Sequence, residues 1–426
     1  MMNGKKYDLL IKNGIIYPAY LKRDMGIKDG RITGLEECIC PEEAEQVIDA
    51  KDCLVSPAFI DGHIHIDKAF LGTGEDFETE LSKTSMLQGC YGEDAVTARF
   101  KDMSESDAVD DIVRRSSRLI EKCVANGTTA IKTNVLVNDN WGWASYKAVN
   151  LLREKYASCI DIQRVLWHKE KYDSLWRELA ANGGIDVIGG WEYVKPNPTT
   201  GRLEYDYHFR PEIDKIFELA KTYDLPIDVH CDENDVPDIQ CFRYIIQKTV
   251  EENMQGRVTC GHVTAMSAHG MQESEIKRAL YECKAADVSV STQTSCNIYL
   301  AAMDRRGPTR VREMLELGVN VSIGSDNIRD PFRPFGNGDM LEEALLTAQI
   351  HKLGTQKELE QVYRMITYNP AKSALLEGYG TTPGCYADLV LLDAPTAAEA
   401  ILSQVDKKYV IKRGKIVAER GTLLPV

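Results

Sequence analysis

Two histidines separated by a single residue are the part of this sequence that most directly suggests chemistry. His63 and His65 lie in the stretch DGHIHIDKAF, at the end of an apolar run that begins at Cys53. On a β-strand, side chains two residues apart point to the same face, so both imidazoles would project to one side and could chelate a metal ion. An isolated HxH motif is equally compatible with two ordinary histidines at a strand end, so the rest of the chain has to decide.

Three further segments place metal-binding or acid–base residues at the ends of predicted strands. They are IDVHCDEN with His230 and Glu233, TCGHVTAM with His262, and IGSDN with Asp326. A single histidine in a barrel strand is more often a hydrogen-bonded polar residue than a ligand. Four histidines at predicted carboxyl ends of strands favour a shared site, because in a closed parallel barrel those ends meet at one mouth.

The predicted metal ligands are His63, His65, His230 and Asp326. Three histidines and one aspartate form a suitable shell for a divalent metal that keeps one position open for water. A bound metal lowers the pKa of such a water to about 7, which supplies hydroxide under neutral conditions. We expect His262 to face the metal or the substrate without being a ligand, and Glu233 to shuttle protons. The alternative for Glu233 is a loop carboxylate that caps the next helix.

Composition and length exclude several classes of protein. The 426 residues are accounted for by a barrel of about 250 or more residues with a smaller domain. The net charge of −14 makes nucleic acid and anionic membrane poor partners. No stretch has the pattern of a signal peptide or a membrane span, so we expect a cytoplasmic protein. The twelve cysteines have no metal-finger or redox spacing, and we predict no disulfides.

The order of predicted elements indicates an α/β protein with a TIM-type (β/α)8 barrel. Apolar runs predict seven strands after the one that ends near His63: 129–135, 161–167, 187–190, 227–230, 257–262, 287–291 and 320–325. Helical periods fall between them, for instance at 104–124, 211–223 and 309–317. Regular alternation to eight strands favours a closed parallel barrel.

Short strands and turns occupy both ends of the chain. Residues 6–56 contain Asn13-Gly14 and Asp29-Gly30 between apolar runs, and such dipeptides are strong hairpin signals. Apolar segments at 387–393 and 409–417 continue the pattern, and since domain termini often lie close together we predict that the two ends complete one sheet. The expected boundaries are 1–56 and 376–426 for the two parts of this terminal β-rich domain, and 57–375 for the barrel.

These residues resemble the amidohydrolase superfamily, and specifically its cytosine deaminase-like branch. The stretches that carry the resemblance are DGHIHIDKAF, DVHCDEND, GHVTAM, RRGPTRVREMLELGVNVSIGSDNIRDPF and FGNGDM. The segment from Asp326 to Met340 is also similar to N-isopropylammelide aminohydrolases, which act on triazine rings. The resemblance implies a TIM-type (β/α)8 barrel with a small β-sandwich domain formed by both chain termini. It also implies a hydrolase of non-peptide C–N bonds with one zinc or iron ion per subunit. It assigns metal binding to His63, His65, His230 and Asp326, and catalysis to Glu233, His262 and Asp326. Relatives commonly self-associate, so a homo-oligomer is expected.

Two positions distinguish this chain within the superfamily. Binuclear relatives have a carbamate-modified lysine at the end of the fourth barrel strand, whereas this chain has Ile188-Gly189-Gly190-Trp191, so one metal is expected. Relatives that deaminate cytosine have a glutamine beyond the third strand, where alignment places Lys169. An ammonium only donates hydrogen bonds and carries charge, which argues against cytosine itself as the substrate. The predicted substrate contacts are Lys169, Trp167, Trp191 and Asn327, although buried tryptophan is more often core.

The leading hypothesis is a hydrolytic deaminase that acts on an amino-substituted heterocycle, such as a cytosine-like pyrimidine or a triazine. Hydrolysis of a cyclic amide is the alternative activity, although carbamate–lysine metal pairs are usual there. A scaffold that has lost its metal is the non-enzyme alternative, and the presence of all four ligands with Glu233 and His262 argues against it. The sequence leaves open the substrate, zinc versus iron, the oligomeric state, and whether Lys169 contacts substrate or a carboxylate such as Glu170.

Overall fold

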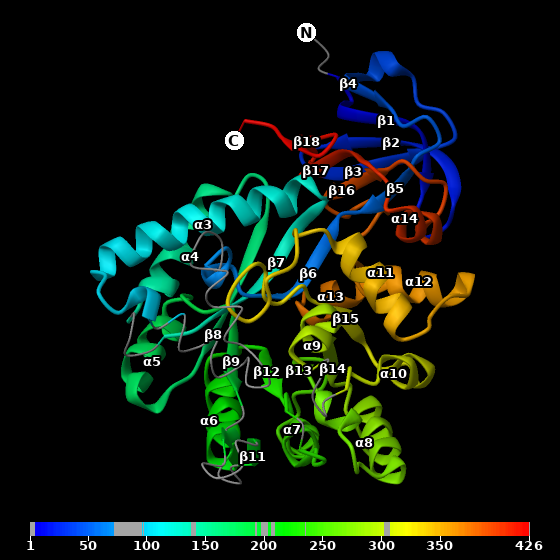
Figure 1. The fold of residues 1–426 in the computed structure, drawn as a ribbon. Helices are drawn as coiled ribbons and strands as arrows, with labels where there is room; N and C mark the ends of the chain where they lie inside the picture. The colour runs from blue at the N-terminus through cyan, green and yellow to red at the C-terminus, as the bar shows by residue number, and fades with distance from the viewer. Residues whose placement is uncertain are drawn as a thin grey trace.

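The chain folds into a barrel surrounded by helices, beside a sheet in which both termini lie (Figure 1). The computed structural model describes residues 5–71, 96, 98–137, 142–191, 194–196, 203–205, 209–234, 236–301 and 307–425. Asp235, Arg305 and Arg306, which belong to the stretches quoted above, lie outside the described residues. Within the described ranges, no helix is long and apolar enough to cross a membrane.

Eight strands form the barrel, in the order β15-β14-β13-β12-β9-β8-β7-β6, and every neighbouring pair is parallel. They are β6 (Phe59–Ile64), β7 (Thr128–Val135), β8 (Asp161–Trp167), β9 (Val187–Trp191), β12 (Ile227–Cys231), β13 (Val258–His262), β14 (Ser289–Thr292) and β15 (Val321–Ile323). The strands expected from the apolar runs are present to within two residues at each end. The prediction of a TIM-type barrel is confirmed.

The first and last strands close the barrel beside the predicted metal ligands. The backbone N–H of Asp326 donates to the carbonyl of His63 at 2.9 Å, and the N–H of His65 donates to the carbonyl of Asp326 at 3.2 Å. Gly324 permits this approach, because a Cβ there would lie 2.5 Å from the carbonyl oxygen of His63. Closure therefore brings three of the four predicted ligands side by side.

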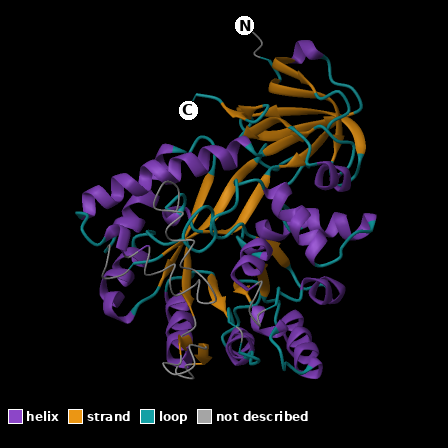
Figure 2. Ribbon diagram, in the orientation of Figure 1, coloured by secondary structure: helices purple, strands orange, loops and turns teal. Residues whose placement is uncertain are grey.

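Helices cover the outside of the barrel (Figure 2). They are α3 (Glu105–Ala125), α4 (Ala144–Lys155), α5 (Asp173–Ala181), α6 (Phe209–Thr222), α7 (Gln240–Glu251), α8 (Glu273–Ala285), α9 (Thr294–Ala301), α10 (Val311–Leu317), α11 (Met340–Ile350), α12 (Gln356–Arg364) and α13 (Tyr368–Ser373). In α3, the Ser104 side chain accepts a hydrogen bond from the N–H of Asp107, which satisfies a free donor of the first turn. Ile112, Leu119 and Ile120 recur at helical spacing and are buried, so one face of α3 packs inward.

Strands from both chain ends form the second sheet. They are β1 (Tyr7–Ile16), β2 (Leu21–Lys28), β3 (Arg31–Glu36), β4 (Ala44–Asp49), β5 (Leu54–Pro57), β16 (Leu389–Leu392), β17 (Lys407–Lys412), β18 (Lys415–Glu419) and β19 (Thr422–Leu423), with α14 (Ala397–Ser403) between β16 and β17. β5 pairs antiparallel with β16, so Val55 lies opposite Leu391. This pairing joins the two ends of the chain, as the sequence predicts.

The two dipeptides expected to form hairpins behave differently. Asp29-Gly30 connects β2 to β3 with positive φ angles of 50° and 73°, which a tight hairpin turn requires. The prediction for Asn13-Gly14 is wrong, because both residues lie inside β1, where a register shift between Ile11 and Gly14 marks a β-bulge. The strand continues past the bulge because Ile15 and the residue after it pair with β5.

One buried lysine connects the terminal sheet to the barrel. Lys412 Nζ donates to Asp388 Oδ2 at 2.8 Å, to Asp161 Oδ2 at 2.5 Å and to the carbonyl of Thr129 at 3.2 Å. Asp161 begins β8 and Thr129 lies in β7, so a single ammonium holds parts of both sheets together. The domain boundaries after residues 56 and 375 stay a prediction.

Candidate active site

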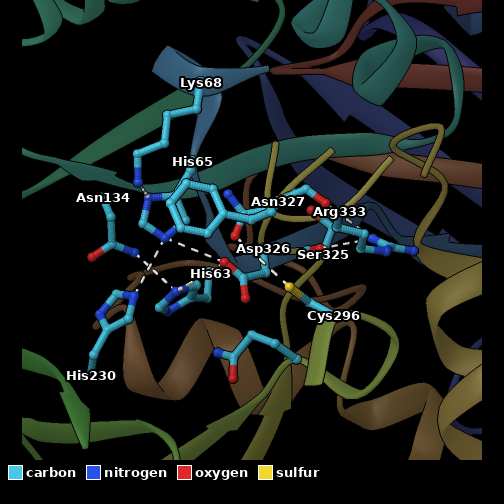
Figure 3. A network of polar contacts seen from close by, with 12 residues as sticks. His63, His65, Lys68, Asn134, His230, Cys296, Ser325, Asp326, Asn327 and Arg333 are labelled. Atoms are coloured by element: carbon cyan, nitrogen blue, oxygen red, sulfur yellow. Dashed lines mark hydrogen bonds and ion pairs between the residues drawn. The ribbon is translucent and has the colours of Figure 1, made fainter. Parts of the chain in front are cut away.

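The predicted metal ligands meet at the carboxyl ends of the barrel strands. His63 lies in β6, His65 directly follows it, His230 lies in β12, and Asp326 follows β15. Figure 3 shows the rings of His63 and His65 beside the carboxylate of Asp326, and the ring of His230 beside that of His65. All four side chains are buried, with exposed fractions of 4% or less. The sequence therefore identified one spatial cluster from three separate segments.

Distances within this cluster match those between ligands of one metal ion. His230 Nε2 lies 3.4 Å from His65 Nε2, and Asp326 Oδ1 lies 3.3 Å from His65 Nε2 and 3.8 Å from His63 Nε2. Zinc–nitrogen bonds of about 2.0–2.1 Å in tetrahedral geometry separate neighbouring ligand atoms by about 3.4 Å. These residues therefore fit a divalent metal ion.

Burial keeps the histidines in the form that binds metal. The pKa values of His63, His65 and His230 all lie well below the ordinary value, first because the rings are removed from water and then because other positive groups are near. Burial raises the pKa of the Asp326 carboxyl. Neutral imidazoles are ready to coordinate a cation, and a cation would also compensate the buried charge of Asp326.

Glu233 and His262 form a second pair at the same mouth. Glu233 Oε2 lies 3.6 Å from His262 Nε2, and their side chains are 15% and 1% exposed. Ligand atoms of His230, Glu233 and His262 all lie within 4.8 Å of one another, so the pair adjoins the metal-binding cluster. In the structure, other carboxylates meet the start of α7: Asp238 accepts from the N–H of Gln240 and Asp232 accepts from the N–H of Phe242, which does not favour Glu233 as the cap of that helix.

A buried aspartate forms hydrogen bonds to the two backbone segments that carry the predicted ligands. Asp61 accepts hydrogen bonds from the N–H of His63 at 3.2 Å and of Ser325 at 3.1 Å, and also from the Ser325 hydroxyl. Burial raises the pKa of Asp61 to about 7, although these hydrogen bonds oppose the shift. Asp61 thus ties the strand of the first ligands to the strand that ends at Asp326.

Two residues near the ligands were not predicted from the sequence. Lys68 Nζ lies 3.2 Å from His65 Nδ1, as Figure 3 shows. Asn134 Nδ2 lies 3.3 Å from His63 Nε2, while its Oδ1 accepts a hydrogen bond from Trp167 Nε1 at 2.9 Å. Lys68 lies in the same stretch as the first histidines, which was an available signal. Asn134 reaches the site only through the pairing of β6 with β7, for which the sequence gives no signal.

The two predicted tryptophans lie at different depths. The Trp167 ring is buried and meets the His230 ring edge to face, with centroids 4.7 Å apart. Trp191 is half-buried and packs against the apolar cluster that contains Trp167. Trp167 therefore forms a wall of the candidate metal site, whereas contact of Trp191 with substrate stays a prediction.

The two predicted polar contacts have different surroundings. Asn327 is buried, and its Nδ2 donates to Asp330 Oδ2 at 2.5 Å. Lys169 is half-buried directly after β8, and within the described residues it forms no ion pair with Glu170. The neighbouring His168 instead binds Asp173 and Glu212, at 3.0 and 2.9 Å. Contact of Lys169 and Asn327 with substrate stays a prediction.

Comparison with known proteins identifies the class to which this fold and site belong. A family model described as "Amidohydrolase family" matches residues 78–418. The N-isopropylammelide isopropyl amidohydrolase of Pseudomonas sp. is 30% identical over 424 residues, with 98% of each chain covered. The chain therefore belongs to the amidohydrolase family.

Several relatives and solved structures similar to this chain are named for hydrolysis or deamination of heterocycles. A pterin deaminase of Rhizobium rhizogenes is 25% identical and covers 93% of this chain and 88% of its own. The crystal structure of N-isopropylammelide isopropylaminohydrolase from Burkholderia multivorans superposes with a TM-score of 0.81 at 26% identity, covering 98% of this chain and 99% of that one. A 5-methylcytosine deaminase from Klebsiella pneumoniae, liganded with phosphonocytosine, gives 0.81 at 25% identity, covering 98% and 100%. The predicted resemblance to the cytosine deaminase-like branch, and the prediction of a hydrolase of non-peptide C–N bonds, are confirmed.

Proposed function

We propose that this protein is a metal-dependent deaminase that hydrolyses the bond between a planar nitrogen heterocycle and its exocyclic amino group. The observation that carries the proposal is the convergence of four metal-type ligands with the pair of Glu233 and His262 at one barrel mouth. Relatives named for N-isopropylammelide, pterin and 5-methylcytosine support a substrate of this class, since each name denotes a flat nitrogen ring.

One divalent ion, zinc or iron, would be held by His63, His65, His230 and Asp326. β9 ends in Gly189, Gly190 and Trp191, so it offers no lysine for a bridging carbamate, and this favours a single ion. The same feature argues against the cyclic amide alternative, which usually relies on a metal pair. We further propose that the protein is cytoplasmic and homo-oligomeric.

Each residue at the mouth has a proposed role. When bound, the metal lowers the pKa of a water to near neutrality and so supplies the nucleophile. Asp326, which faces His63 and His65, accepts a proton from that nucleophile. Glu233 delivers a proton to the ring nitrogen, which makes the adjacent carbon electrophilic, and His262 steadies the attacking oxygen. Asp326 then passes its proton to the exocyclic nitrogen, and the C–N bond breaks to release ammonia or an amine.

A substrate panel tests this function. Protein loaded with zinc or with iron is incubated with aminopyrimidines, aminotriazines, pterins and cyclic guanidines, and ammonia or amine release is measured. Cyclic amides such as hydantoins are assayed in parallel for ring opening. We expect metal-dependent release from at least one aminated ring. Ring opening of cyclic amides without any amine release would refute the proposal in favour of the alternative.

A further inference from the structure

His262 has an unusual backbone conformation and is contacted by three buried polar side chains. Its φ angle is 67°, in the left-handed region that is uncommon for residues other than glycine, although histidine adopts it more often than most. Three buried side chains contact it: Gln293 Oε1 accepts from its N–H at 3.1 Å, the Thr309 hydroxyl donates to its carbonyl at 2.7 Å, and Asn297 Oδ1 lies 2.9 Å from its Nδ1. These three side chains are at most 2% exposed. Such a backbone conformation persists only where surrounding contacts enforce it.

The hydrogen positions in this group follow from counting donors and acceptors. A threonine hydroxyl has one hydrogen to donate, and the Thr309 hydroxyl donates it to the His262 carbonyl. Thr309 Oγ1 can therefore only accept from Asn297, whose Nδ2 lies 3.5 Å away. The amide oxygen of Asn297 then faces His262 Nδ1, so this nitrogen has to carry the hydrogen.

Further hydroxyl groups make the same arrangement self-consistent. The Thr292 hydroxyl donates to Thr309 Oγ1 at 2.9 Å, so Thr292 accepts from the Thr294 hydroxyl at 3.2 Å. Thr294 in turn accepts from His351 Nε2 at 3.3 Å. Because the Thr294 hydroxyl gives its hydrogen to Thr292, it can only accept from His351, which places a hydrogen on His351 Nε2. Burial lowers the pKa of His351 to about 4. Each group in this series, from His351 through the three threonine hydroxyls, therefore donates to the next one, and the last donates to the carbonyl of His262.

We propose that Asn297 is a positioning residue that holds His262 in the tautomer with hydrogen on Nδ1. The nitrogen that faces the reaction, Nε2, then carries a lone pair in the neutral ring. It is buried, has no hydrogen-bond partner among the described residues, and lies 3.6 Å from Glu233 Oε2. In this tautomer, Nε2 of the neutral ring can accept a hydrogen bond from the attacking water and so orient its oxygen toward the substrate.

This inference rests on the proposed catalytic role of His262, but its structural part can be measured independently. In zinc-loaded protein with ¹⁵N-labelled histidine, long-range ¹⁵N–¹H correlation spectra distinguish the Nδ1–H from the Nε2–H tautomer. A His262→Asn variant assigns the signal. Wild-type protein is expected to show His262 with hydrogen on Nδ1, and a signal with hydrogen on Nε2 would overturn the inference.

Two substitutions at position 297 separate positioning from mere packing. Asn297→Leu keeps the branching of the side chain but removes the acceptor. We expect loss of the single Nδ1–H signal and a fall in kcat of about 10- to 100-fold with KM nearly unchanged, the size typical of removing the outer partner of a metal-binding histidine. Asn297→Asp keeps an acceptor oxygen and should retain the tautomer and most of the kcat. Thr309→Val leaves Asn297 in place but frees its amide to rotate, and should give mixed tautomer signals.

The control is Asn320→Leu. Asn320 donates to Ser289 Oγ and to the carbonyl of Asn369, both at 3.1 Å, and directly precedes β15 at its amino end, away from the mouth. Its loss should leave the His262 signal and kcat unchanged. Equal kinetic effects of Asn297→Leu and Asn320→Leu, with the Nδ1–H signal intact in both, would refute the positioning role. If wild-type protein releases no amine from any ring, the proposed function fails, while the tautomer measurement still stands.

Discussion

Replacing one partner of a buried ion pair inside the barrel should lower the free energy of unfolding strongly. Replacing both partners should change it little. Lys132 in β7 and Asp228 in β12 form this pair inside the barrel, with side chains 2% and 0% exposed. Burial raises the pKa of Asp228, and the ammonium of Lys132 opposes that shift. No second ion pair of Asp228 is present in the described part of the chain. Lys132 thus supplies the positive charge that compensates a buried Asp228 carboxylate.

The size of the effect follows from this burial. Breaking a buried pair leaves an uncompensated charge, so Lys132→Met should lower the free energy of unfolding by about 3–5 kcal/mol. The double variant Lys132→Met/Asp228→Val removes both charges and should lie within about 1 kcal/mol of wild type. For comparison, Lys372 pairs with Asp287 where both side chains are nearly half exposed, and Lys372→Met should cost about 1 kcal/mol or less.

Urea-induced unfolding, followed by tryptophan fluorescence at one fixed saturating zinc concentration, measures these differences. The double variant is expected to recover most of the stability that the single variant loses. Equal instability of the single and double variants would show that Lys132 contributes packing and not charge compensation.

Four further predictions concern the site and the domains. Glu233→Gln cannot shuttle a proton, so kcat should fall by about two to four powers of ten while metal content stays normal, and near-wild-type kcat would remove Glu233 from the mechanism. Burial alone would lower the pKa of His168, but its two carboxylate partners outweigh burial and raise it. The pairing of His168 with these carboxylates therefore stabilises the fold fully below pH 6.5, and this stabilisation is lost as the pH rises through the raised pKa. His168→Phe should destabilise the protein more at pH 6 than at pH 9 in urea titrations. If Lys169 meets an anionic or carbonyl oxygen of the substrate, Lys169→Gln should weaken turnover of anionic rings and improve that of cytosine, whereas equal effects on both would leave Lys169 a structural charge. Deleting the last forty residues removes the partner strand of β5 and should reduce hydrogen-exchange protection of residues 6–35; unchanged protection would show that the two ends are independent.

The fold was predictable because its signals are local and repeated. Apolar strands alternate with helical periods, and the two histidines in DGHIHIDKAF differ in type and spacing from ordinary core residues. Parallel strand ends necessarily converge in a closed barrel, so the ligands could be grouped before any geometry was known. The same locality explains the error at Asn13-Gly14, where pairing with a distant strand turned a hairpin signal into a bulge.

The residues that support the ligands were not predictable in this way. Asn134 and Asn297 are common residue types without a characteristic spacing. They reach the site through strand register and through the helix that follows β14. Their roles depend on hydrogen-bond distances of about 3 Å between segments far apart in sequence, and a sequence pattern does not encode such distances.

The central claim is that one metal ion held by three histidines and Asp326 drives hydrolysis of a C–N bond, and metal titration of activity tests it most directly. Metal-stripped protein is reloaded stepwise with zinc or iron, and bound metal and amine release are measured on the same samples. We predict that activity rises in proportion to bound metal and saturates at one ion per chain, and that His65→Ala stays folded by circular dichroism but binds no ion and is inactive. Full activity in metal-stripped protein, or in His65→Ala without metal, would contradict the account.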